Sequence, residues 1–166
     1  RVTNALCWCF PEVQDWMIEN CNKYQKEKYL EPLLGGQKRE CYAITETGSG
    51  SDVENSINST AEKKDNNYII NGEKWYVTGA NKADFFFLQA KIKGGQNSGS
   101  HALFFVDKNS SGVELVDTPL FSHTYAFHHS IYRFKNVMVS ENNLIGKEGD
   151  GMSFTHSWFR HERLGI

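Results

Sequence analysis

The chain has 166 residues, with 18 basic and 20 acidic side chains and a formal net charge of −2. This length suits one domain with a sizeable core and appended helices. This near-neutral charge gives no reason to expect a nucleic-acid partner, because recognition of nucleic acid needs clustered positive charge. No apolar run approaches membrane-spanning length, which predicts a soluble protein. The sequence shows no signal peptide and no starting Met, so we expect it to be part of a longer protein.

The first predicted element is helical and covers residues 11–34, where apolar side chains recur at helical spacing. Pro11 can open such a helix, because its missing N–H would be unpaired there in any case. Asn22 can cap a second piece. Pro32 and the pair Gly35-Gly36 are expected to end it.

After Lys38 the apolar residues take the spacing of strands. The predicted strands are residues 41–45, 59–63, 68–70, 74–78, 85–91, 102–107, 113–116 and 130–139. Asn71-Gly72 predicts a tight hairpin, because both central residues of such a turn need positive φ. About eight short strands separated by turns predict a β-sandwich or β-barrel.

A last helix is expected to begin near Gly151, with Asp150 as its cap. One face of it would carry Met152, Thr155, Phe159, Glu162 and Ile166.

The cysteines and histidines give no metal or disulfide pattern. Cys7, Cys9, Cys21 and Cys41 lack the paired spacing of zinc ribbons, and reduced, mostly buried thiols in an intracellular protein are expected. His128 and His129 are adjacent in a strand and point to opposite faces, so with His123 they make a poor metal site, and no metal is predicted.

The stretch "CYAITETGSGSDV", residues 41–53, combines glycines with hydroxyl and carboxylate side chains. It lacks the third glycine of a dinucleotide fingerprint, and "VENSINST" after it does not have a helical pattern. It also lacks the lysine of a phosphate loop. Two readings stay open from these residues: a backbone concavity that binds an anion, and a plain Gly/Ser turn capped by Asp52.

Three segments in order, "CYAITETGSGSDV", "YIINGEKWYVTGANKADFFFLQA" and "RFKNVMVSENNLIGKEGDGM", resemble the signature segments of the acyl-CoA dehydrogenase family. The resemblance runs from about Asn22 to the end. It implies a mainly β fold, a barrel like the family's middle domain with flanking α-helices. Residues 1–37 would end an N-terminal helical domain, residues 38–148 would form the middle β barrel, and residues 149–166 would start a C-terminal helical domain.

The resemblance also implies a reaction. Family members bind FAD and remove hydrogens from Cα and Cβ of an acyl-CoA thioester. A carboxylate takes the Cα proton and flavin N5 takes the Cβ hydride. Expected partners are an acyl-CoA, electron-transfer flavoprotein and further copies of the chain in a dimer or tetramer, in fatty-acid β-oxidation, in the mitochondrial matrix or bacterial cytoplasm. The acyl-chain length is not predicted.

Individual site residues follow from the same resemblance. The cofactor-binding residues would be Tyr42, Ala43, Ile44 and Thr45 under the flavin ring, Gly50 and Ser51 at its diphosphate, and Tyr76, Val77 and Thr78 on the other side of the ring. Ser51, Ser100 and Arg163 would contact the CoA arm. Glu162 would be the catalytic base, as in those branches of the family that carry it in a Glu-Arg pair at this point. Other branches supply the base from later in the C-terminal domain, beyond Ile166, and Glu162 would then be a structural surface residue.

The chain departs from the family pattern at three of these segments. Thr47 stands where the family usually has proline, and Tyr76 where it commonly has tryptophan. Arg160 stands where an acidic residue is common, so only Arg163 is carried over. Tyrosine still offers an aromatic face that can stack and exclude water.

Two other functions are consistent with such a chain. One is a non-catalytic β-barrel module for binding or assembly, and the other is a flavin oxidase or monooxygenase of the same superfamily. The hydroxyls of Thr45, Ser51 and Thr78 favour a flavin over the first alternative, since a scaffold has no need of them. Glu162 favours dehydrogenation over the second, because a carboxylate on an apolar helix face suits a base near neutral pH.

Overall fold

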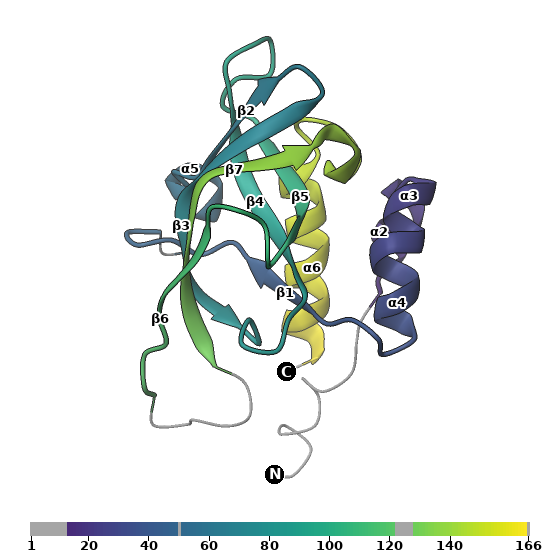
Figure 1. Cartoon of the computed structure of the whole chain (residues 1–166), viewed down its shortest axis with the longest axis vertical. Coiled ribbons are helices and arrows are strands. Elements are labelled where there is room, and N and C mark those ends of the chain that lie inside the picture. Colours follow the sequence, from purple (N-terminus) through teal and green to yellow (C-terminus); the bar gives the residue numbers. More distant parts are fainter. Residues whose placement is uncertain (1–12, 50, 122–127, 166) are drawn as a thin grey trace.

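The computed structural model describes residues 13–49, 51–121 and 128–165, and the chain forms one curled, half-barrel sheet with helices against one face (Figure 1). The strands are β1 (Glu40–Ala43), β2 (Thr60–Lys64), β3 (Asn67–Thr78), β4 (Phe85–Lys93), β5 (His101–Asp107), β6 (Val113–Asp117) and β7 (His129–Ser140). The prediction of a mainly β barrel with flanking helices is confirmed.

Strand β4 is the centre of the sheet. It pairs with β5 along one edge, antiparallel, while β1 and β2 share its other edge, both parallel to it. Strand β3 pairs antiparallel with β2 and β7, and β6 pairs with β7. Strand β1 pairs with the first half of this edge of β4 and β2 with the second half. The segment that follows β1 is therefore close to the start of β2.

Both faces of β4 are covered, which explains its continuous apolar run. Phe86 and Leu88 point into the barrel core, whereas Phe85 and Phe87 face the helices. Helix α6 (Gly151–Gly165) packs on that outer face through Phe154 and Trp158, and the N-terminal helices lie on the same side (Figure 1).

The face that α6 buries is not the predicted one. Phe154, Thr155 and Trp158 are buried, whereas Phe159 and Glu162 are half-buried, and Ile166 lies outside the described residues. The buried face of α6 is determined by the large aromatic rings of Phe154 and Trp158, which lie one turn apart and were not part of the predicted face. Asp150 directly precedes α6, as expected of its cap, and its carbonyl accepts from the Phe154 N–H at 3.3 Å, while its carboxylate accepts from the Lys147 N–H at 3.1 Å.

The N-terminal helical region is confirmed from Asp15 onward, as α2 (Asp15–Asn20), α3 (Lys23–Gln25), a π-helical turn (Lys26–Leu30) and α4 (Glu31–Leu34). Asn22 caps α3 as predicted, in a reciprocal capping box with Gln25. Pro11 lies outside the described residues.

Pro32 does not end the helix, which was the expectation. It lies inside α4, and the chain leaves the helix only at Gly35. A proline removes the hydrogen bond that the carbonyl four residues earlier would accept. That carbonyl belongs to Lys28, and it accepts instead from the Lys38 ammonium at 2.9 Å. A side chain from beyond the helix therefore replaces the missing donor.

The prediction of a hairpin at Asn71-Gly72 was wrong. Strand β3 runs straight through both residues, and the hairpin lies at Asp65, which has φ 52°. Gly72 is needed for a close approach instead: a Cβ there would lie 2.0 Å from Ser59 Oγ. The β3–β7 register shifts at this point, so glycine marks a β-bulge.

Two further points complete the fold. Residues Val53–Ser56 form the one-turn helix α5, against the expectation that this stretch is not helical, and Glu141–Asn143 form a 3-10 turn. Cys21 and Cys41 are free and buried, while Cys7, Cys9 and His123 lie outside the described residues. Within the described part of the chain, no helix is long and apolar enough to span a membrane.

Candidate functional site

The segment after β1 lies against the bulged end of β3. The backbone N–H of Trp75 donates to the Thr45 carbonyl at 2.7 Å. This bond brings together two of the three segments expected to hold a cofactor, residues 42–45 and 76–78. Ala43 and Ile44 are buried, whereas Thr45 is half-buried at the edge of the sheet.

Tyr76 stands on a strained backbone and points outward. Its φ is 54°, in the left-handed region that a bulky residue rarely adopts, and 52% of its surface is exposed. The strand register shifts between Lys74 and Val77, so the strain belongs to a bulge that turns the Tyr76 ring out while Val77 stays buried. Strain of about 1–3 kcal/mol at one residue is typical of functional sites.

Thr78, at the end of β3, is half-buried and its hydroxyl lies 2.8 Å from Nδ1 of His129. The edge of the Phe121 ring contacts His129 with 5.2 Å between ring centroids, and Phe121 also lies 6.0 Å from the Tyr76 ring. The bulged end of β3 therefore carries an aromatic group and a hydroxyl next to one another. The partner His129 was not expected at this position.

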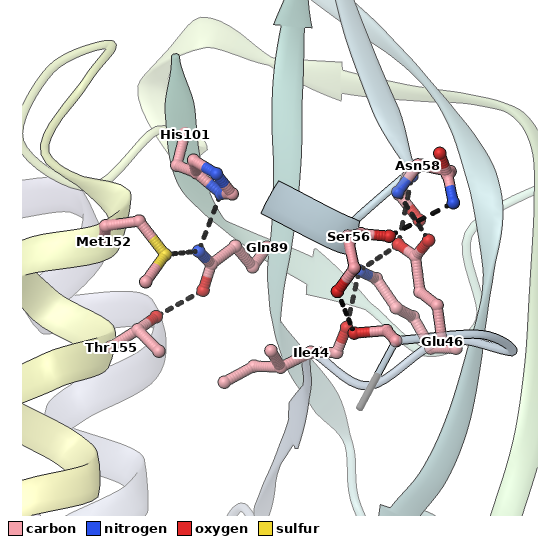
Figure 2. A network of polar contacts seen from close by, with 11 residues as sticks. Ile44, Glu46, Ser56, Asn58, Gln89, His101, Met152 and Thr155 are labelled. Carbon is pink, nitrogen blue, oxygen red and sulfur yellow. Dashed lines mark hydrogen bonds and ion pairs between the residues drawn. The ribbon is translucent and has the colours of Figure 1, made fainter. Parts of the chain in front are cut away.

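A buried ion pair fixes the segment after β1. The Lys74 ammonium lies 2.7 Å from Glu46 Oε1 and donates to the Ile44 carbonyl at 2.9 Å. The Glu46 carboxylate also accepts from the backbone N–H groups of Asn58 at 2.6 Å and Ser59 at 3.0 Å (Figure 2). One carboxylate thus joins the segment after β1, β3 and the start of β2.

The two charges of this pair are shifted by their surroundings. Burial lowers the pKa of Lys74 to about 8, against the opposing effect of Glu46. Burial alone would raise the pKa of Glu46, but Lys74 and the hydrogen bonds outweigh it and lower the pKa. This pair was not predicted from the sequence. Lys74 is four residues after the buried Ile70 in β3, a spacing that puts both side chains on the same face of a strand, so its burial could have been predicted.

The Gly/Ser loop, residues 47–52, is held at both ends. Glu46 anchors its start, and Ser49 near its middle contacts Ser56 through a hydroxyl–hydroxyl bond of 2.9 Å. Asp52 caps α5 by accepting from the Asn55 N–H at 3.3 Å, as the plain-turn reading expected. Ser51 is exposed, and Gly50 lies outside the described residues.

Two side chains of the sheet hold α5 in turn. His101 Nε2 lies 2.7 Å from the Glu54 carbonyl, and the Lys91 ammonium donates to the Asn55 carbonyl at 2.9 Å. The carbonyls of Glu54 and Asn55 lie at the end of a one-turn helix, where no backbone N–H of the helix can donate to them. The two side chains supply the missing donors.

Helix α6 reaches strand β1 through Tyr42. The Tyr42 hydroxyl lies 3.3 Å from Thr155 Oγ1, and its ring packs on Trp158 with 4.7 Å between centroids. Burial is the main cause that raises the pKa of Tyr42, and the negative charge of Glu162 raises it further. Glu162 is half-buried and lies one turn beyond Trp158 on α6. Arg163 is exposed and its guanidinium carbon lies 5.3 Å from the centre of the Phe159 ring.

A polar pocket of about 350 Å³ opens between α5, β5 and the start of α6. It is lined by Glu54, Asn55, Lys91, Gly99, Ser100, His101, Gly149 and Met152. Ser100 lines it as one of the residues expected at the substrate. Thr45, Ser51 and Thr78 are not among its lining residues, so the pocket is separate from the bulged end of β3.

No group of three or more His, Cys, Asp or Glu side chains that could hold a metal ion occurs in the described ranges. The site is therefore built from hydroxyls, backbone groups, an exposed aromatic ring and one buried ion pair.

Comparisons with known proteins identify the family of the chain. A family model described as "Acyl-CoA dehydrogenase, middle domain" matches residues 41–137. An acyl-CoA dehydrogenase of Bacillus subtilis is 34% identical over 145 residues, which is 87% of this chain and 38% of that protein. This chain therefore spans little more than a third of that relative's length.

Solved structures give the same likeness. An acyl-CoA dehydrogenase from Geobacillus kaustophilus superposes with a TM-score of 0.82 at 27% identity, over 93% of this chain and 41% of that one. An acyl-CoA dehydrogenase from Bacillus anthracis, solved in complex with FAD, superposes with a TM-score of 0.74 at 32% identity, over 81% of this chain and 23% of that one.

Proposed function

Because the chain belongs to the acyl-CoA dehydrogenase family, we propose that it supplies the middle domain of an FAD-dependent acyl-CoA dehydrogenase. In that protein, residues 1–37 end an N-terminal helical domain, residues 38–148 form the middle domain, and residues 149–166 begin a C-terminal helical domain. Relatives more than twice as long support this division.

The observation that carries the proposal is the contact of Thr45 with the bulged end of β3. The Trp75 N–H donates to the Thr45 carbonyl, so the half-buried Thr45 contacts the residue next to Tyr76, whose backbone is strained and whose ring is exposed. A flat aromatic face beside a polar strand edge suits a planar ring with a hydrogen-bonding rim, which is the shape of a flavin. The FAD complex of the B. anthracis relative supports the same cofactor.

The residues of the chain divide the work of holding FAD. Backbone groups of Tyr42, Ala43, Ile44 and Thr45 bind the rim of the ring, and the buried Lys74–Glu46 pair keeps this segment in place. The ring of Tyr76 and the hydroxyl of Thr78 lie on its other side, with Val77 packed in the core. Gly50 and Ser51 bind the diphosphate. When bound, FAD supplies the electron sink for the reaction.

The acyl-CoA arm occupies the pocket beside β5. Ser100 contributes a hydroxyl there, Lys91 a positive charge and Asn55 an amide, a set that suits the amides and hydroxyl of a CoA arm. Ser51 and Arg163 make further contacts with it. Glu162, on the α6 face near Tyr42, removes the Cα proton of the thioester.

The electron acceptor is electron-transfer flavoprotein and the protein acts as a homo-oligomer in fatty-acid β-oxidation. Both proposals follow from family membership alone. No observation in the described residues favours an oxidase or a non-catalytic module over the dehydrogenase.

The proposed function is tested on the purified full-length protein. We expect it to be yellow, and an acyl-CoA series added without oxygen should bleach the flavin absorbance for at least one chain length. A colourless protein that takes up no added FAD would contradict the flavin. A yellow protein that no acyl-CoA bleaches would favour oxygen chemistry instead.

A further inference from the structure

The side chains of His101, Gln89, Thr155 and Tyr42 form one hydrogen-bonded chain between the barrel and α6, and Figure 2 shows the first three of them. His101 Nε2 lies 2.7 Å from the Glu54 carbonyl, and its Nδ1 lies 3.0 Å from the amide nitrogen of Gln89. The Thr155 hydroxyl donates to the amide oxygen of Gln89, and Tyr42 lies 3.3 Å from Thr155. His101, Gln89 and Thr155 are buried, and Tyr42 is half-buried.

The directions of the bonds that join Met152, Gln89, His101 and Glu54 are set by groups that only accept. The Met152 thioether is an acceptor, and it lies 2.8 Å from the amide nitrogen of Gln89. This nitrogen therefore faces both Met152 and His101, and Nδ1 of His101 must accept from it. The imidazole proton is then on Nε2, where the Glu54 carbonyl, also only an acceptor, receives it.

The chain connects two parts of the proposed site. One end holds α5 and so the loop of residues 47–52, and the other end is Tyr42, on the strand proposed to lie under the flavin. His101 also lines the pocket proposed for the CoA arm. Its bond to Glu54 holds the wall of that pocket on which Asn55 stands.

We propose that His101 is a positioning residue for the substrate arm, which in its neutral form, protonated at Nε2, holds α5 against β5 and joins it to Tyr42. The proposal rests on the proposed function in taking the CoA arm as the ligand of this pocket. A second proton on His101 would place an N–H against the amide N–H₂ of Gln89, and two facing donors cannot bond. Protonation therefore breaks the chain at Gln89.

The surroundings of His101 disfavour that second proton. Burial lowers the pKa of His101, and the positive charges of Lys91 on β4 and Lys74 on β3 lower it further, while Glu54 on α5 acts in the opposite direction. Helix α6 presents only the uncharged Met152 and Thr155 to Gln89.

The protonation state is tested by long-range ¹H–¹⁵N NMR of the histidines, assigned with a His101→Phe variant. At pH 7 we expect the wild-type His101 to be neutral with its proton on Nε2. Gln89→Glu, of the same shape, replaces the amide nitrogen with a carboxylate oxygen, so His101 should carry both protons at pH 7. Thr155→Val is the control, because it leaves both contacts of His101 in place and should keep the wild-type signal. A doubly protonated wild-type His101, or no change in Gln89→Glu, would overturn the proposal.

The positioning role is tested by the affinity of the full-length protein for CoA. His101→Gln keeps a donor within reach of the Glu54 carbonyl, whereas His101→Phe has none and the shorter His101→Asn cannot reach it. Loss of one hydrogen bond corresponds to about five-fold weaker binding, so KM should rise about five-fold in the Phe and Asn variants with kcat unchanged. The Gln variant should regain most of the affinity.

Wild-type affinity in both the Phe and Asn variants would overturn the positioning role, and if one of them fails to fold the other decides. A wild-type protein that binds neither FAD nor CoA contradicts the proposed function and the role at the substrate. In that event the NMR result still decides the state of His101 by itself.

Discussion

The ammonium of Lys74 lies 2.7 Å from the carboxylate of Glu46, and the Lys74 side chain is completely buried. Each charge has further partners: the Ile44 carbonyl for Lys74, and two backbone N–H groups for Glu46. A buried ion pair is favourable only when its remaining hydrogen-bonding capacity is satisfied in this way. The pair therefore acts as a rigid link between β3 and the segment under the proposed flavin.

Breaking this pair on one side should be costly. We expect Lys74→Met to lower the free energy of unfolding by about 3–5 kcal/mol, because it leaves the Glu46 carboxylate buried without its counter-charge. The double variant Lys74→Met, Glu46→Gln removes both charges and should recover a large part of that loss. Urea unfolding monitored by circular dichroism measures both. A double variant less stable than the single one would contradict the argument.

Gly72 offers a test of the bulge in β3. Gly72→Ala places a Cβ 2.0 Å from Ser59 Oγ, and we expect a loss of about 2 kcal/mol or more, at the upper range of overpacked sites. Ser59→Gly in the same chain removes the two closest clashing atoms, Oγ and Cβ, and leaves the Ser59 Cα at 2.8 Å, so it should restore part of the stability. Gly35→Ala is the matched control: Gly35 has φ −74° and its nearest contact is 3.4 Å away, so its change should be within about 0.5 kcal/mol.

Strand positions and the barrel followed from the sequence because local apolar spacing determines them. The connections did not follow in the same way. Asn71-Gly72 has the local signature of a turn, but the fold uses Gly72 for close contact with Ser59, which lies thirteen residues away in the chain. Pro32 likewise has the local signature of a helix end, but the helix continues past it, and the Lys38 ammonium donates to the Lys28 carbonyl that the proline leaves without its helical donor.

The site could be predicted in part. The resemblance named Thr45, Tyr76 and Thr78, and the structure brings the segments of Thr45 and Tyr76 together through one backbone hydrogen bond. The supporting residues were missed, because Glu46 and His101 act on groups distant in sequence. Period-2 burial along β3 indicates that Lys74 is inside, but nothing local to it names Glu46 as its partner.

The role of Glu162 is tested by Glu162→Gln in the full-length protein. We expect the variant to stay yellow while bleaching by acyl-CoA slows by about 10²–10⁴-fold, because an amide cannot accept the Cα proton. Glu141→Gln is a suitable control, since Glu141 forms a surface ion pair with Lys63 at 3.3 Å and has no place in the proposed site. Bleaching at the wild-type rate in the Glu162 variant would place the base elsewhere.

The lowered pKa of His101 predicts that the folded protein loses stability in mild acid. Its pKa in the folded protein is below the ordinary value of 6.5, so the unfolded chain binds a proton first as the pH falls. The free energy of unfolding should therefore decrease as the pH is lowered from about 6.5 toward the folded-state pKa, and become level below it. A series of urea titrations between pH 7.5 and 5 measures this slope. In His101→Phe the slope should be shallower, and an identical slope would show that other groups cause it.

Tyr76 should show a trade-off between stability and cofactor binding. Tyr76→Gly relieves the backbone strain at φ 54° and should raise the free energy of unfolding of the cofactor-free protein by about 1 kcal/mol. The same change removes the aromatic face proposed to stack on the flavin, so FAD affinity should fall by about ten-fold, the equivalent of a stacked aromatic pair. Tyr76→Trp keeps an aromatic face on the strained backbone and should retain both the lower stability and the affinity. Fluorescence titration with FAD and urea unfolding measure the two effects separately. If Tyr76→Gly bound FAD as tightly as the wild type, the exposed ring would have no part in holding the flavin, and its strain would need another explanation.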